Sequence, residues 1–140
     1  NAICNSFKKE LLEATHNFKS SGGNSFKLAL YTSSATLGKS TTSFTTDNQV
    51  SATGQYASGG SALTNAGTSL SSDTALVDFA DLSFTGVTLT ARGALIYNDT
   101  ASGDPAVCVL NFGSDKTATS GTFTIQFPAF TSSAAVIRIA

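Results

Sequence analysis

Few side chains in the sequence could carry out covalent chemistry, and the single histidine is the first to consider. His16 is the only histidine among 140 residues, and a serine or cysteine nucleophile needs a nearby base, which is usually histidine. It falls near the end of a segment with helical periodicity, close to Glu13. No Gly-x-Ser-x-Gly motif accompanies it. We therefore interpret His16 as a surface or helix-end histidine and not as a catalytic base.

Carboxylate pairs could support glycoside hydrolysis if the fold held them at a suitable separation. Glu10 and Glu13 are close together on the expected helix, and most aspartates stand beside turn residues, where they accept hydrogen bonds from the local backbone. Asp78 and Asp81 are the exception, because they bracket Phe79 within an apolar run. We interpret them as guards of an edge strand against wrong pairing. The alternative is a cation site that they share with turn carbonyls.

The cysteines and glycines form no recognisable ligand motif. Cys4 and Cys108 are the only cysteines, and neither belongs to a Cys-x-x-Cys pair, which excludes the usual zinc patterns. A disulfide between them is left open, but Cys108 stands between two valines of a predicted strand and is interpreted as a small buried hydrophobe. The Gly-Gly pairs lack the lysine of a phosphate-binding loop. The sequence therefore predicts no enzymatic activity, no cofactor and no metal.

The charge of the chain is low and scattered. Eight Lys and Arg residues balance nine Asp and Glu residues, and the charged fraction of 12% is about half the usual value. Nucleic-acid binding requires clustered cations, and only Lys8 and Lys9 are adjacent, so no nucleic-acid partner is expected. No apolar run approaches the roughly 18 residues of a membrane span. The first residues lack the features of a signal peptide, which predicts synthesis and use, or assembly, in a cytoplasm.

One short helix is predicted at the N-terminus, within residues 1–19. Its apolar positions recur every three or four residues, as on the buried face of an amphipathic helix. Asn5 or Ser6 could cap its start, and the Ser- and Gly-rich stretch 20–24 ends it. The apolar stripe consists of Ile3, Phe7, Leu11, Ala14 and Phe18.

From residue 24 onwards the periodicity changes to two, the period of a strand with one buried face. In the stretch 24–32, for example, Phe26, Leu28 and Leu30 share one face, and Lys27, Ala29 and Tyr31 are expected on the outward face. The nearly continuous apolar stretch 106–112 predicts a central strand, whereas 32–47 and 113–121 are predicted to be polar connections. The other predicted strands are 49–56, 61–65, 74–79, 82–84, 87–99 with a break at Arg92–Gly93, 122–127 and 134–140.

These elements predict a mainly β fold with one short N-terminal α-helix. Antiparallel strands joined by polar turns, without crossover helices, are typical of a β-sandwich of the jelly-roll or immunoglobulin-like kind. The 20 serines and 20 threonines agree with this, because threonine favours strands and serine favours turns. We expect a single domain over residues 1–140, with the helical segment at 1–19 and the strands at 24–140.

The stretches that carry a family resemblance are 26–38 (FKLALYTSSATLG), 91–99 (ARGALIYND), 109–128 (VLNFGSDKTATSGTFTIQFP) and 135–140 (AVIRIA). They resemble a widespread family of small virion structural proteins of tailed bacteriophages, over nearly the whole chain. Asn111 stands where the family usually has aspartate, and Cys108 where it has a small residue. The resemblance implies a non-enzymatic head decoration (cement) protein on the capsid exterior, which binds the major capsid protein and stabilises the head.

A decoration protein works by contact, and many weak contacts add up over a lattice. The resemblance also implies a homo-oligomer, for which a trimer is one arrangement. The N-terminal helix and the long Ser/Thr-rich loop 32–47 are the parts that a β core explains least, so we expect them to contact the capsid and sister subunits. For the helix the alternative is that it covers one open end of the sandwich. The expected contact residues are Phe7, Leu11, Phe18, Thr32, Leu37, Lys39 and Phe44.

Two other functions remain open at the level of the sequence. The first is a tail component, such as a fibre adaptor or a receptor-contacting tip domain, in which the same loops touch glycans or another tail protein. The second is a carbohydrate-binding module, which the absence of tryptophan and the presence of only three tyrosines disfavour. Copy number separates the decoration protein from the tail component, because a head carries hundreds of decoration copies. Glycan binding by the isolated domain would identify the module.

Overall fold

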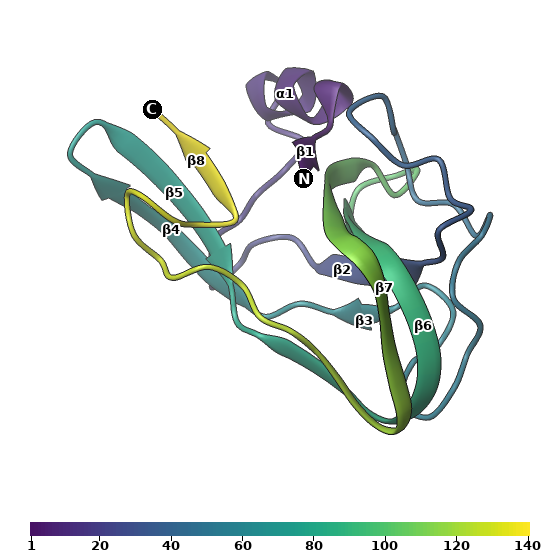
Figure 1. Ribbon diagram of the computed structural model, residues 1–140. Helices are drawn as coiled ribbons and strands as arrows, with labels where there is room; N and C mark the ends of the chain where they lie inside the picture. The colour runs from purple at the N-terminus through teal and green to yellow at the C-terminus, as the bar shows by residue number, and fades with distance from the viewer.

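The chain folds into two antiparallel sheets with one short helix above them (Figure 1). The computed structural model describes residues 1–140. Its elements are β1 (Ala2–Ile3), α1 (Asn5–Leu12), β2 (Phe26–Tyr31), β3 (Ser61–Ala62), β4 (Asn65–Ser71), β5 (Thr74–Phe79), β6 (Leu82–Asn98), β7 (Ala106–Ile125) and β8 (Ile137–Ile139).

The two sheets pack as a β-sandwich, which confirms the predicted fold class. The larger sheet has the strand order β1-β7-β6-β2-β3 and the smaller sheet the order β4-β5-β8, with every neighbouring pair antiparallel. Phe79 of the smaller sheet joins the two layers. Its ring centroid lies 5.8 Å from that of Phe26 in the larger sheet and 6.0 Å from that of Phe127. These rings belong to one cluster of 29 buried hydrophobic residues.

Strand β2 is buried on both faces, although its sequence predicts only one buried face. Ala29 and Tyr31, expected to face outward, are as buried as Phe26. The reason is the long connection 32–60, which folds back over this face. The hydroxyl of Tyr31 donates to the carbonyl oxygen of Thr45 (2.6 Å), and the backbone N–H of Val50 donates to the carbonyl oxygen of Leu30 (2.9 Å).

The β6–β7 hairpin is a long ribbon that curves around the lower end of the molecule in Figure 1. The predicted break at Arg92–Gly93 is a register shift inside a continuous strand. The prediction of a connection at 113–121 is wrong, because these residues continue β7 and pair with β6. Their pairing includes a cross-strand hydrogen bond between the hydroxyls of Thr90 and Thr117 (2.9 Å). Ala118 is the one buried residue within 113–121, and the other residues there are polar or glycine, so apolar periodicity does not reveal this part of the strand.

The predicted helix over residues 1–19 is too long. Helix α1 covers Asn5–Leu12 with Cys4 at its N-cap, not Asn5 or Ser6, and residues 2–3 form β1 on the edge of β7. The chain leaves the helix at Ala14, whose φ of 60° is left-handed. The remaining stripe residue Phe18 is buried by the irregular chain that follows, and its ring stacks on Phe26 at 4.4 Å. With eight residues, α1 is too short to span a membrane.

The Ser- and Gly-rich middle of the chain also departs from prediction. The strand predicted at 49–56 is absent, and only isolated bridges join Gln49 to Tyr31 and Thr53 to Tyr56. The strand predicted at 61–65 is limited to β3, and β4 was not predicted because its sequence, NAGTSLS, contains one large apolar residue. By contrast, the strand predicted at 74–79 matches β5.

Candidate contact surface

An apolar groove lies between the N-terminal segment (residues 1–24) and the smaller sheet, with a volume of about 440 Å³. One wall is formed by the end of α1 and the chain that follows it, including Leu11, Ala14 and Phe18. The opposite wall is a face of the smaller sheet. The residues of the sheet that line the groove include Thr68 from β4, Ala75 and Val77 from β5, and Ile137 and Ile139 from β8.

Exposed apolar side chains surround this groove. Leu70 is paired with Ala75, and Ala75 with Ile139, so the three side chains form a row on one face of the sheet. Leu70 is 73% exposed and Ile139 54%. Leu12, at the end of α1 beside the lining residue Leu11, is 91% exposed. Two of the four exposed large hydrophobic residues of the chain, Leu70 and Ile139, therefore lie on the sheet face that lines the groove, which is typical of a protein contact site.

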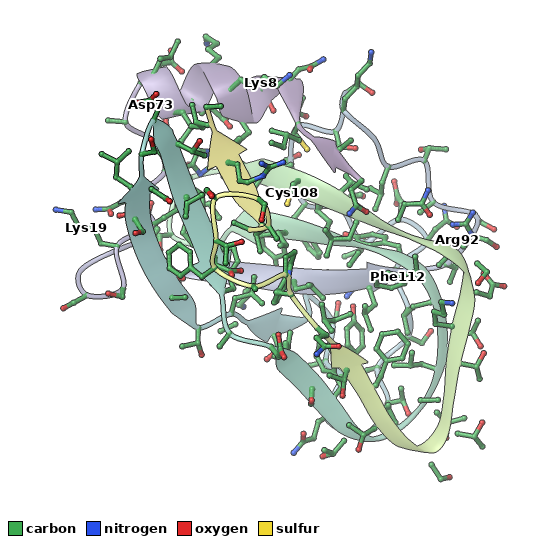
Figure 2. The ribbon with its side chains drawn as sticks, turned by 60° about the vertical axis from the view of Figure 1, so that its left-hand side comes forward. Lys8, Lys19, Asp73, Arg92, Cys108 and Phe112 are labelled. Carbon is green, nitrogen blue, oxygen red and sulfur yellow. The ribbon has the colours of Figure 1, made fainter.

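The groove is nearly free of charge. Lys19 is its one charged lining residue, and Lys9 and Glu13, which pair at 3.4 Å, are not among the lining residues. Asp73, in the turn between β4 and β5, lies at the same end of the molecule as α1 (Figure 2). A partner that covers this surface would therefore strip water from few charges, which lowers the desolvation cost of binding.

His16 positions the N-terminal wall, and its predicted place on the surface is wrong. Its side chain is fully buried. Nε2 lies 3.1 Å from Oε1 of Glu10, and Nδ1 lies 3.0 Å from Nδ2 of Asn98 at the end of β6. The ring packs against Phe7 with centroids 4.8 Å apart. The histidine thus fastens the chain after α1 to the larger sheet.

The residues predicted as contacts in the N-terminal segment divide into two kinds. Phe7 and Phe18 are 1% and 6% exposed, so both are core residues; Phe18 also lines the groove, whereas Phe7 does not reach it. Leu11 is half-buried and lines the groove. The segment covers one end of the sandwich, as in the alternative interpretation, and it also forms one wall of the groove.

The predicted loop residues lie elsewhere, at the other end of α1 and over the larger sheet. Leu37 packs against the core, and Phe44 stacks on Tyr97 with centroids 4.6 Å apart. Thr32 is half-buried and donates its hydroxyl to the carbonyl oxygen of Asn48 (3.2 Å). Lys39 is exposed, and its carbonyl oxygen accepts the N–H of Asn5 at the start of α1 (2.8 Å). The loop therefore touches the helix without reaching the groove.

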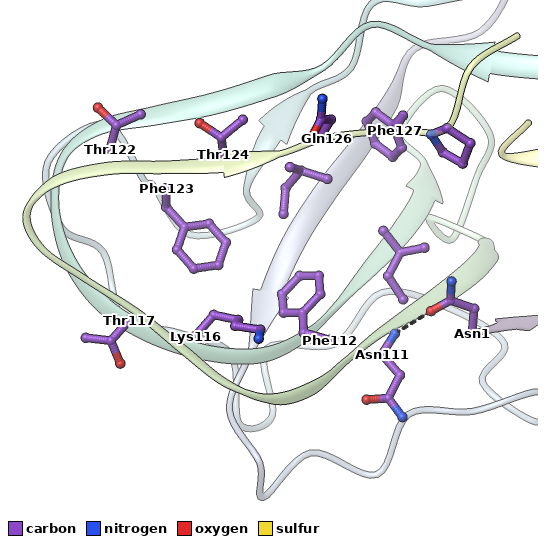
Figure 3. Close-up of a pocket in the computed structure, with 13 residues that line it drawn as sticks. Asn1, Asn111, Phe112, Lys116, Thr117, Thr122, Phe123, Thr124, Gln126 and Phe127 are labelled. Carbon is purple, nitrogen blue, oxygen red and sulfur yellow. Dashed lines mark hydrogen bonds between the residues drawn. The ribbon is translucent and has the colours of Figure 1, made fainter.

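A second hollow, of about 560 Å³, lies inside the bend of the β6–β7 ribbon. Phe112 and Phe123 approach each other within it, with ring centroids 6.1 Å apart, and Lys116 stands beside them (Figure 3). At its edge the N–H of Asn111 donates to Oδ1 of Asn1 (2.8 Å). This side-chain bond occupies a backbone donor on the outer edge of β7, where another strand would otherwise pair.

The two cysteines and the pair Asp78 and Asp81 have structural roles in the fold. Cys4 and Cys108 are buried free thiols, and burial raises their pKa to about 11 and about 12, so neither is a reactive thiolate. The interpretation of Asp78 as an edge guard is wrong, because β5 is the central strand of its sheet. Asp81 accepts the N–H of Phe127 (2.8 Å) and ties the end of β7 to the start of β6. Nowhere do three His, Cys, Asp or Glu side chains gather as a metal site.

Leu12, Leu70 and Ile139 were not among the predicted contact residues. The periodicity of the helix placed Leu12 beside the apolar stripe, and the row of Leu70 with Ile139 depends on pairing between segments far apart in sequence. The only available signal was a leucine within the otherwise small and polar stretch 65–71.

In comparisons with protein-family models, curated proteins and solved structures, no match to this chain was found.

Proposed function

We propose that this chain is a non-enzymatic virion structural protein of a tailed bacteriophage, and specifically a decoration protein that binds the major capsid protein on the outside of the head. The observation that carries the proposal is the apolar groove with the exposed side chains of Leu70 and Ile139 on its sheet face. A surface of this kind binds protein by burying apolar area, about 25 cal/mol for each Å² removed from water. The resemblance of four long stretches to phage virion proteins supports the same function.

The groove is the expected capsid-facing surface. It lies at one end of the molecule, between the N-terminal segment and the smaller sheet, and Leu70 and Ile139 share one face of that sheet, so a single contact could cover both side chains. The rest of the surface is rich in Ser and Thr and presents few charges to neighbouring subunits. Repetition over a lattice makes even a modest contact effective, since many copies act together.

The first experiment is a measurement of stoichiometry. Quantitative mass spectrometry of purified virions would compare the amount of this chain with that of the major capsid protein. A ratio within a few-fold of one supports a decoration protein on the head lattice. A ratio near a dozen copies per particle would contradict it and place the chain in the tail or neck, where the alternative of a tail component applies.

A further inference from the structure

A third hollow, of about 320 Å³, lies against the larger sheet, and Arg92 of β6 is its one charged lining residue. Gly93 pairs with Tyr31 of β2 on one side and with Asn111 of β7 on the other, and it has no side chain to fill the space at this position. The hollow shares no lining residue with the groove, and Arg92 lies on the opposite side of the molecule from Lys19 (Figure 2). Its other lining residues come from β2 and the chain after it, from β6 and from β7: Tyr31, Thr32, Ser33, Ala35, Leu37, Gly93, Val109, Leu110 and Asn111.

The positive charge of Arg92 has no counter-charge within the chain. Its side chain is half-buried, and it forms no ion pair with any Asp or Glu. Nη1 donates to Oδ1 of Asn111, which also accepts the backbone N–H of Gly113 (2.9 Å). Asn111 is neutral, so it orients the guanidinium without cancelling its charge. Most of the N–H donors of the guanidinium therefore remain for a ligand, and a cation partly removed from water favours an anion beside it.

The lining indicates which anion fits. A guanidinium matches the two oxygens of a carboxylate with parallel hydrogen bonds, and the exposed Ser33 adds a hydroxyl beside it. A phosphate group carries about two negative charges at neutral pH, whereas the hollow offers one cation. Ala35, Leu37 and Leu110 supply apolar walls. The volume is at the lower end of ligand pockets, which begin at roughly 300 Å³, so the hollow suits one carboxylate with a short apolar neighbour and not a large cofactor.

We propose that this hollow binds an acidic side chain, Asp or Glu, of a partner protein, with its carboxylate on the guanidinium of Arg92 and apolar neighbours of the acid on Leu37 and Leu110. A protein partner agrees with the sequence, which predicts Thr32 and Leu37 to be contact residues, and both line the hollow. Because the site is open to solvent, its affinity falls as the salt concentration rises. The site is separate from the groove and does not depend on the proposed function.

Titration by nitrogen-15 NMR at low salt tests the site with two short peptides, acetyl-Leu-Asp-Leu-amide and its Asn counterpart. The Asp peptide should shift the Nε–H resonance of Arg92 and the backbone amides of Ser33 and Gly93. The Asn peptide should bind at least about tenfold more weakly, because it lacks the charge. Equal binding of the two peptides would overturn the proposal. So would acetate or inorganic phosphate that binds as tightly as the Asp peptide, since the site would then take a free anion.

Asn111→Asp is the sharpest variant, because it keeps the acceptor for Arg92 and for the N–H of Gly113 and supplies the carboxylate from within the chain. It should fold like the wild type and bind the Asp peptide at least about tenfold more weakly, as should Arg92→Gln. Arg138→Gln is the control, since it removes the same charge from an exposed arginine that bonds to the carbonyl oxygen of Ser132 (3.0 Å). This control should bind like the wild type.

Wild-type affinity in Asn111→Asp would show that Arg92 does not hold the acid and would refute the proposal. If Arg92→Gln does not fold, Asn111→Asp and the two peptides still decide the question. Analytical ultracentrifugation tests the other occupant of the hollow, a second copy of this chain. Self-association of the wild type that Arg92→Gln and Asn111→Asp both abolish would identify that occupant and contradict a separate partner protein.

Discussion

Tyr56 shows how one side chain holds a long connection in place. Its hydroxyl oxygen accepts hydrogen bonds from the backbone N–H of Leu30 (2.8 Å) and from Nε2 of Gln49 (2.8 Å). The ring is almost fully buried and packs against Phe84. A single phenol thereby joins the connection 32–60 to the end of β2. This polar contact lies inside an otherwise apolar region, where a buried polar group without a hydrogen-bond partner lowers the stability of the fold.

Tyr56→Phe should lower the free energy of unfolding by about 1–3 kcal/mol, because it leaves the buried N–H of Leu30 without an acceptor. Urea denaturation measures the change. Tyr97→Phe is the matched control, since the hydroxyl of Tyr97 donates to the carbonyl oxygen of Gly59 (2.6 Å) and its loss leaves only an acceptor unpaired, which is tolerated better. An equal or larger effect in the control would contradict this explanation.

Asp78 gives a prediction for how the stability of the fold depends on pH. Burial raises the pKa of this carboxyl, and Asp81 raises it further, while the N–H of Phe79 lowers it. The folded state therefore binds the proton more tightly than the unfolded chain, so the carboxyl favours folding at low pH and opposes it as the pH rises through the folded pKa. Asp78→Asn should stabilise the protein at pH 7, and the gain should disappear below the ordinary value of 3.8. Thermal unfolding at both pH values checks this, and a gain that persists in acid would refute it.

At the scale of elements, the position of β3 beside β2 depends on the absence of a side chain at one glycine. Gly60 has a φ of +81°, and a Cβ there would lie 1.8 Å from the carbonyl oxygen of Leu28. The turn before β3 therefore approaches the backbone of β2 more closely than any other residue type permits. Gly22 has a similar φ of +76° but open space around it.

Gly60→Ala should destabilise the fold by about 3 kcal/mol or more, because left-handed strain and a backbone clash act together. Gly22→Ala carries the strain alone and should cost about 1 kcal/mol. Chemical denaturation gives the loss in unfolding free energy for each variant. The difference between the two losses is the energetic contribution of the close approach of β3 to β2. Equal losses would mean that the turn can move away without disturbing β2.

At the scale of the whole molecule, the apolar end is predicted to bind the capsid. Leu70→Asp and Ile139→Asp should each weaken binding to heads that lack this protein by at least about tenfold, because a charge would be buried against apolar surface. Stability should change little, since both side chains are largely exposed. Co-sedimentation with such heads gives the affinity, and thermal unfolding controls for the fold.

Thr122→Asp provides the control for this surface. Thr122 is also exposed and in a strand, but it lies at the second hollow and away from the groove. It should leave head binding unchanged. If Thr122→Asp weakens binding and the two groove variants do not, the contact lies in the bend of the β6–β7 ribbon instead.

The sequence by itself determined the β-sandwich, the short N-terminal helix and several strands, among them β5 and the end of β7 with Phe123, Ile125 and Phe127 inward. These follow from local periodicity, because a half-buried element must alternate apolar and polar residues with its own period. The burial of Cys108 was predicted from its place between two valines in a nearly continuous apolar stretch.

Only the tertiary structure decided the rest. The polar half of the β6–β7 ribbon, the burial of His16 beside Asn98 and the row formed by Leu70 and Ile139 all join residues distant in sequence. Phe7 and Phe18 are core residues because the chain after α1 turns back onto β2, and no pattern within the N-terminal segment indicates that turn. Periodicity specifies which residues prefer burial, whereas the pairing of distant strands specifies which of them remain exposed together.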